Sequence, residues 1–136
     1  MLARVAASGL DELWLLGTVP AGYPSPAQDY GAERIDLTRQ LIKDPAATFL
    51  FRVVGDSMEG AGIYDGDVLL IDRSIEPGNS AVVVASIDGE YTVKRLHRGD
   101  GFVELRPENP RYPVIRVDGL SELVIFGVVT YCIHHV

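Results

Sequence analysis

The chain has 136 residues, of which 47% are hydrophobic and 23% charged, a balance typical of a globular domain and not of a disordered or membrane-spanning chain. Its 12 Lys and Arg residues against 19 Asp and Glu residues give a net charge of −7, so we expect no direct binding to nucleic acid phosphates. Cys132 is the single cysteine, which excludes an internal disulfide and indicates a reducing compartment.

The N-terminal 20 residues contain one short apolar run, Leu13–Leu16, directly after Asp11 and Glu12. The acidic pair, with Arg4 as the lone preceding positive charge, does not fit a signal peptide. No apolar run in the chain reaches the roughly 18 to 20 residues that cross a bilayer. We therefore expect a cytoplasmic protein without a membrane segment.

A proline-rich stretch follows this run. Pro20, Pro24 and Pro26 lie within seven positions, and their spacing favours extended backbone that is neither helix nor central strand. The pattern predicts a flexible N-terminal arm over residues 1–27 and a β-rich domain over residues 28–136.

One short helix is predicted between the arm and the β-rich part. Asp36 can cap a helix over residues 37–43, and Asp44 with Pro45 would end it. The composition changes at about Thr48, where short β-type runs begin.

Seven such runs are separated by turns rich in Gly, Asp, Asn and Pro. They predict a mostly β fold, either a sandwich or a barrel-like sheet. The last run is long and apolar, and we expect it to be an edge strand that pairs with a second copy in a homodimer, unless neighbouring strands of the same chain cover it. The runs are residues 48–54, 67–73, 80–87, 90–96, 102–106, 113–117 and 122–136.

Two polar residues within this β pattern are candidates for catalysis. Ser57 follows a strand at the start of a glycine-rich turn, where the backbone N–H groups of Ser57 and Met58 could form an oxyanion hole. Serines in such turns more commonly bond only the local backbone. Lys94 lies on a strand after a hairpin turn, and it could act as a general base if burial lowered its pKa. The alternative is a lysine whose amine reaches into water.

Other constellations are weaker. A catalytic triad would have to recruit His97, His134 or His135, and the local sequence gives no support for it. Cys132 and His134 share one side of a strand, but two ligands are too few for a typical metal site. No phosphate-binding glycine loop of the P-loop type occurs. We therefore expect neither a metal nor a cofactor.

Five segments of the chain carry a family resemblance: VPAGYPSPAQDY, RIDLTRQLIKDPAATFLFRVVGDSMEGAGIYDGDVLLIDRSIEPG, DGEYTVKRL, PENPRY and VIFGVVTY. Together they resemble the UmuD family of self-cleaving accessory subunits of error-prone translesion DNA polymerases, which is related to LexA-type repressors. The resemblance implies the LexA/UmuD-type C-terminal peptidase fold, with twisted antiparallel sheets that form a partly open, barrel-like structure, one short helix and an extended N-terminal arm. It runs from about Thr18 to Tyr131.

This resemblance also implies an activity. Ser57 would be the nucleophile and Lys94 the general base of a serine/lysine dyad, and the bond cut would join Ala21 to Gly22. In the family, cleavage is stimulated by the RecA filament on single-stranded DNA in the SOS response to DNA damage. The trimmed, dimeric form then serves a UmuC-type polymerase.

Two departures and two alternatives stand beside this reading. The turn at residues 78–81 differs from the Gly-Asp that the family usually has there, and residues 1–17 match nothing specific. A truncated LexA-type repressor core is one alternative, although about 20 residues before the proline arm are too few for a helix-turn-helix with its supporting helices. A non-catalytic β interaction module is the other.

Overall fold

The computed structural model describes residues 12–26 and 31–136, and the chain forms two compact units, Met1–Lys43 and Asp44–Val136. This division lies close to Thr48, where the composition changes. The assignment of residues 1–27 to an arm and 28–136 to a peptidase domain remains a prediction.

The first unit contains a two-stranded sheet and a short helix. Strand β1 (Glu12–Leu15) pairs antiparallel with β2 (Glu33–Asp36), and α1 (Leu37–Leu41) follows directly. The predicted cap is confirmed, because the side chain of Asp36 accepts a hydrogen bond of 3.2 Å from the backbone N–H of Arg39. The strand pair was not predicted, since β2 is only four residues long and three of them are charged.

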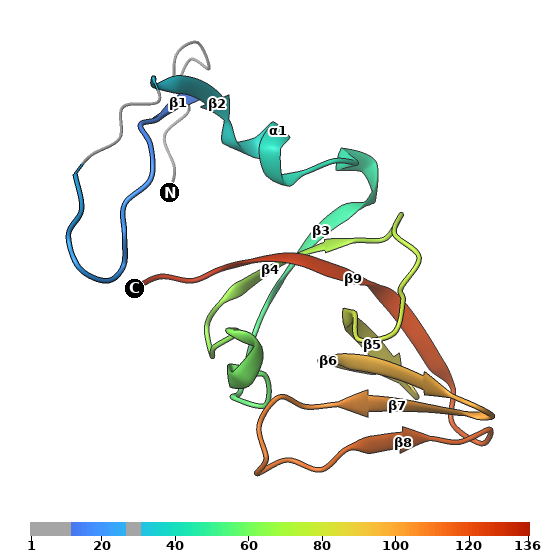
Figure 1. Cartoon of the computed structure of the whole chain (residues 1–136). Helices are drawn as coiled ribbons and strands as arrows, with labels where there is room; N and C mark the ends of the chain where they lie inside the picture. The colour runs from blue at the N-terminus through green and yellow to red at the C-terminus, as the bar shows by residue number, and fades with distance from the viewer. Residues whose placement is uncertain (1–11, 27–30) are drawn as a thin grey trace. The chain divides into compact units, whose positions relative to one another are not determined.

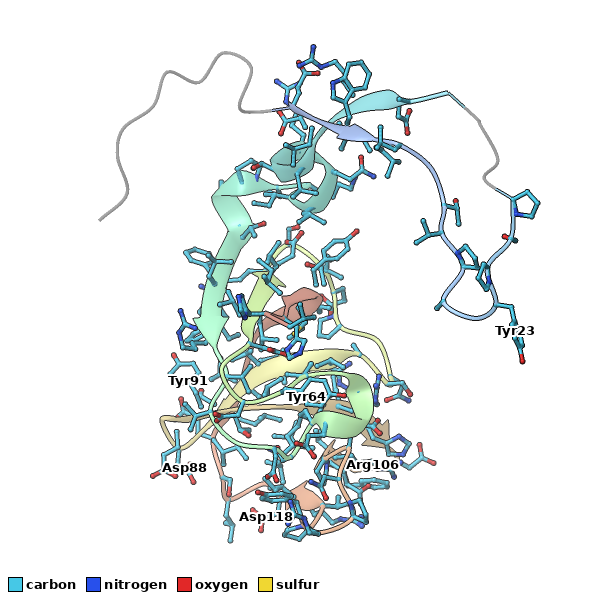
Figure 2. The ribbon with its side chains drawn as sticks, turned by 90° about the vertical axis from the view of Figure 1, so that its left-hand side faces the viewer. Tyr23, Tyr64, Asp88, Tyr91, Arg106 and Asp118 are labelled. Carbon is cyan, nitrogen blue, oxygen red and sulfur yellow. The ribbon has the colours of Figure 1, made fainter. Side chains whose placement is uncertain are left out.

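The loop between β1 and β2 carries the predicted cleavage bond. Its described parts, residues 16–26 and 31–32, form neither helix nor strand, and Ala21 and Gly22 are exposed. Tyr23 is 95% exposed and points outward from the tip of the loop (Figure 2). A peptide bond in this setting is open to attack.

The second unit is built on one antiparallel sheet in the order β3-β4-β9-β5-β6-β7-β8 (Figure 1). Each of its strands overlaps one of the seven predicted runs, so the mostly β fold is confirmed. The sheet is open, with β3 and β8 at its edges. The strands are β3 (Thr48–Arg52), β4 (Val68–Asp72), β5 (Val82–Ile87), β6 (Glu90–Gly99), β7 (Phe102–Arg106), β8 (Ile115–Val117) and β9 (Leu123–Ile133).

The prediction that the C-terminal run is an edge strand is wrong. Strand β9 lies between β4 and β5 and pairs with both. Its two faces contribute to different apolar clusters, with Phe126 and Val129 on one side and Ile125 and Val128 on the other. A strand that packs against apolar clusters on both faces has a nearly continuous apolar sequence, which is why the length and composition of β9 did not distinguish it from an edge strand.

Buried side chains form two apolar clusters. The adjacent residues Val83 and Val84 of β5 belong to different clusters, as expected for successive side chains of a central strand. Cluster 1 consists of Val53, Met58, Ile63, Leu69, Ile71 and Val84, and cluster 2 of Val83, Ala85, Leu96, Leu105 and Val117. None of the helices in residues 12–26 and 31–136 has the length and apolar character needed to span a membrane.

Candidate active site

The turn after β3 presents Ser57. Met58, the next residue, is 1% exposed and packs in cluster 1, so it anchors the turn in the core. Gly60 allows a close backbone approach on the other side of the turn. Its N–H donates 2.8 Å to the carbonyl oxygen of Glu108, and a Cβ added at Gly60 would lie 2.6 Å from that oxygen. These anchors leave the Ser57 hydroxyl free to face β6.

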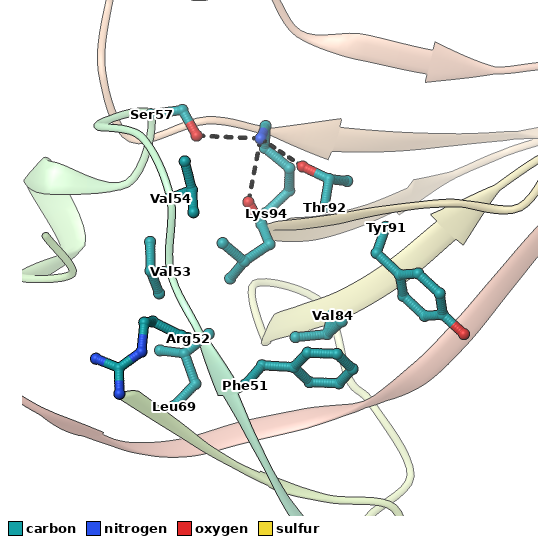
Figure 3. A pocket seen from close by; sticks show the side chains of 11 residues that line it. Phe51, Arg52, Val53, Val54, Ser57, Leu69, Val84, Tyr91, Thr92 and Lys94 are labelled. Atoms are coloured by element: carbon teal, nitrogen blue, oxygen red, sulfur yellow. Dashed lines mark hydrogen bonds between the residues drawn. The ribbon is translucent and has the colours of Figure 1, made fainter. Parts of the chain in front are cut away.

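Lys94 meets this hydroxyl from β6. The residue is only 8% exposed, and its Nζ lies 3.1 Å from Ser57 Oγ. The same Nζ lies 2.8 Å from Thr92 Oγ1 and 3.1 Å from the carbonyl oxygen of Val93 (Figure 3). The two side chains singled out from the sequence are therefore within hydrogen-bond distance of each other.

Burial sets the protonation chemistry of this lysine. Desolvation lowers the pKa of Lys94 from its ordinary value of 10.5, because a charged amine is less stable away from water. In the neutral form, two N–H groups can donate to Thr92 Oγ1 and the Val93 carbonyl, and the remaining lone pair then faces Ser57 Oγ. This arrangement allows the amine to accept the hydroxyl proton.

Thr92 contacts the candidate base, and the sequence reasoning did not single it out. Thr92 lies two residues before Lys94, so both side chains lie on the same face of the strand. The sequence did not indicate that the lysine amine is buried and lies beside the Thr92 hydroxyl. The sequence therefore indicated that the two side chains share a face of the strand, but not how deeply that face is buried.

We expect Thr92→Val to slow the self-cleavage that the resemblance implies about tenfold at alkaline pH, where the amine starts neutral, since one net hydrogen bond of about 1 to 1.5 kcal/mol to Lys94 is lost. The pH midpoint of the rate should also fall, because the protonated amine loses an acceptor. Rates measured from neutral to alkaline pH test this. Thr92→Ser keeps the hydroxyl and should retain the wild-type profile. A Thr92→Val variant with wild-type rate and midpoint would contradict the role.

A groove of about 240 Å³ adjoins the two side chains. One wall is Phe51–Val54 and the other is Tyr91–Lys94, and the rings of Phe51 and Tyr91 lie 5.8 Å apart. Strand β3 pairs only with β4, and the 90–94 part of β6 pairs only with β5 within the described chain. Both walls therefore have an open strand edge, which can hydrogen-bond to an extended peptide.

The predicted oxyanion donors are available. In residues 12–26 and 31–136, no hydrogen bond takes up the backbone N–H of Ser57 or of Met58. One N–H group belongs to Ser57 itself and the other to the next residue. Both are therefore suited to binding an oxyanion that forms beside Ser57 Oγ.

The remaining sequence candidates lie elsewhere. The His97 ring contacts Phe102, with centroids 6.1 Å apart, and His134 Nδ1 lies 2.6 Å from Asp67 Oδ1. Cys132 Sγ contacts the other oxygen of Asp67 at 3.1 Å, and burial raises the pKa of this thiol to about 11. The part of the chain that the structure describes contains no group of three or more His, Cys, Asp or Glu side chains that could hold a metal ion.

Comparison with known proteins adds the family context. The family described as Peptidase S24-like matches residues 14–130. Protein SamA of Salmonella typhimurium is 47% identical over 115 residues, which cover 85% of this chain and 79% of that protein. Protein MucA of Escherichia coli is 44% identical over 117 residues, covering 85% and 80%. The LexA repressor of Bordetella petrii is 40% identical over 114 residues, covering 84% of this chain and 50% of the repressor.

Proposed function

The chain belongs to the Peptidase S24-like family, and we propose that it is a self-cleaving serine endopeptidase with Ser57 as nucleophile and Lys94 as general base. The observation that carries the proposal is the 3.1 Å separation of Ser57 Oγ and a buried Lys94 Nζ. A buried lysine beside a hydroxyl is the arrangement that activates a serine without a histidine.

The proposed reaction has two stages. Neutral Lys94 takes the hydroxyl proton as Ser57 Oγ attacks the carbonyl carbon of Ala21, and the oxyanion binds the N–H groups of Ser57 and Met58. The ammonium then donates its proton to the nitrogen of Gly22 as the peptide bond breaks. In the second stage, water attacks the Ala21 ester, Lys94 takes the water proton, and that proton returns to Ser57 Oγ.

The proposed substrate segment fits this chemistry. Ala21 and Gly22 are small, so a peptide held in the groove can bring its carbonyl carbon close to Ser57 Oγ. The exposed loop around them forms no helix or strand in its described part, as an extended peptide docking on open strand edges requires. The products would be residues 1–21 and 22–136, and the second would keep the entire sheet that contains the dyad.

We further propose a place for this reaction in the SOS response to DNA damage. On this proposal, a RecA filament on single-stranded DNA stimulates the cleavage in the cytoplasm. The trimmed homodimer then acts as accessory subunit of a UmuC-type translesion polymerase. The resemblance of both catalytic segments and of the cleavage segment to the UmuD family supports it. The stimulating partner must bind the cleavable conformer more tightly than the resting one.

Intact-mass measurement tests the proposed reaction. The purified chain, incubated at about pH 10 where more of the lysine is neutral, should yield residues 1–21 and 22–136, while Ser57→Ala stays whole. A chain that remains whole would favour the non-catalytic β module, and a cut at another bond would refute Ala21–Gly22. Near neutral pH, RecA filaments should accelerate the same cut, and an unchanged rate would contradict the RecA step.

A further inference from the structure

We propose that the segment Pro107–Tyr112, here called the clamp segment, sets the distance between Ser57 and Lys94, with Glu108 and Asp56 as positioning residues. The inference rests on the proposed function. The PENPRY sequence of this segment contributed to the family resemblance, but no function was assigned to it. It contacts Asp56, which directly precedes Ser57, and Arg95, which directly follows Lys94.

The clamp segment holds the residue directly before the nucleophile. The side chains of Arg111 and Tyr112 both donate to the carboxylate of Asp56. The side-chain amide of Asn109 donates 2.9 Å to the carbonyl oxygen of Asp56. Three side chains from one segment thus fix both the side chain and the backbone of the residue that precedes Ser57.

Glu108 links the two halves of the dyad. Its backbone N–H donates 2.8 Å to the carbonyl oxygen of Ser57, and its own carbonyl accepts 2.8 Å from Gly60 N–H. Its carboxylate meets Arg95 Nε at 2.6 Å, and Arg95 directly follows Lys94 on β6. One residue therefore holds the serine turn by its backbone and the lysine strand by its side chain.

Such a link matters because strand pairing does not hold Ser57. The residue lies after β3 in a turn, so the sheet fixes Lys94 but not the nucleophile. A misplacement of about 1 Å between reacting groups can lower a rate about 100-fold. The clamp segment supplies the contacts that the sheet does not.

Two variants weaken the clamp without touching the dyad. Glu108→Ala removes the contact with Arg95, and Tyr112→Phe removes one donor to Asp56. We expect each to lower the self-cleavage rate about 10- to 100-fold at every pH, with the pH midpoint unchanged. Glu108→Gln keeps an acceptor for Arg95 and should recover part of the rate.

The matched control is Glu104→Ala. Glu104 also pairs with arginines, Arg106 at 2.7 Å and Arg116 at 3.7 Å, but it lies on β7, and within the described chain it forms no side-chain hydrogen bond or ion pair with Ser57 or the clamp segment. It should keep the wild-type cleavage rate. Equal losses of cleavage rate in Glu104→Ala and Glu108→Ala would mean that the effect comes from a general loss of stability, and would overturn the proposal.

Hydrogen exchange gives a readout that does not depend on cleavage. The N–H groups of Gly60 and Ala61 are hydrogen-bonded, and both should exchange faster in Glu108→Ala and Tyr112→Phe than in Glu104→Ala. Wild-type exchange at both positions in both clamp variants would overturn the inference, whatever the cleavage rate. A wild-type chain that never cleaves would defeat the proposed function, while faster exchange in the clamp variants would still support the clamp.

Discussion

Replacing Ser57 with Ala, or Lys94 with Met or Arg, should abolish self-cleavage throughout the range from neutral to strongly alkaline pH. The alanine variant has no nucleophile. Methionine fills a similar volume but cannot accept a proton, and arginine stays protonated. A positioned base raises the reaction rate about 10²- to 10⁴-fold. Each lysine variant should therefore form no detectable product in the time that the wild-type chain needs to be cleaved completely.

Intact-mass measurement over a time course, with thermal unfolding of each variant, checks this expectation. The unfolding curves are needed because a variant that does not fold would also fail to cleave. His97→Ala is the matched control, since the ring lies on the same strand as Lys94 but contacts Phe102; it should cleave at the wild-type rate. Product from Lys94→Arg, or none from His97→Ala, would defeat the serine/lysine assignment.

The wild-type rate should rise about tenfold for each pH unit until Lys94 is largely neutral, because the neutral fraction of a base rises by that factor below its pKa. The sign follows from the role of the lysine: the uncharged amine is the active form. The ordinary pKa of a lysine is 10.5, and burial lowers the pKa of Lys94. The rate should therefore level off at a pH below 10.5.

A second titrating group requires a control in this pH range. The pKa of the Cys132 thiol is about 11, so Cys132→Ala should be measured beside the wild type and should show the same profile. A rate that is flat with pH would contradict a lysine base. A profile that disappears in Cys132→Ala would assign the titration to the thiol instead.

The same protonation equilibrium would restrain the reaction under resting conditions. A substrate segment tethered to its own catalyst has a high effective concentration, so an active lysine at neutral pH would soon consume the chain. The lowered pKa of Lys94 makes the active, neutral amine more accessible. The three oxygen atoms around its Nζ can also accept hydrogen bonds from the ammonium form, so the protonated lysine is accommodated at the same position. On the proposed mechanism, protonation of Lys94 restrains cleavage at neutral pH, and higher pH removes this restraint.

The sequence by itself determined α1 and the seven strands of the large sheet, and it singled out the two residues of the proposed dyad. Asp36 predicted the start of α1, and the seven apolar runs predicted the strands of the large sheet. Such predictions succeed because caps and side-chain alternation act between residues close together in the chain. The GDSM and TVKRL segments identified Ser57 and Lys94 through family resemblance, which also needs no coordinates.

Only the tertiary structure decided where these elements meet. It placed β9 in the interior of the sheet and buried Lys94, and it brought the clamp segment against the serine turn. Strand order and side-chain depth depend on pairings between distant parts of the chain. Local periodicity carries no information on which strand lies beside which, so an apolar strand reads alike at the edge and at the centre.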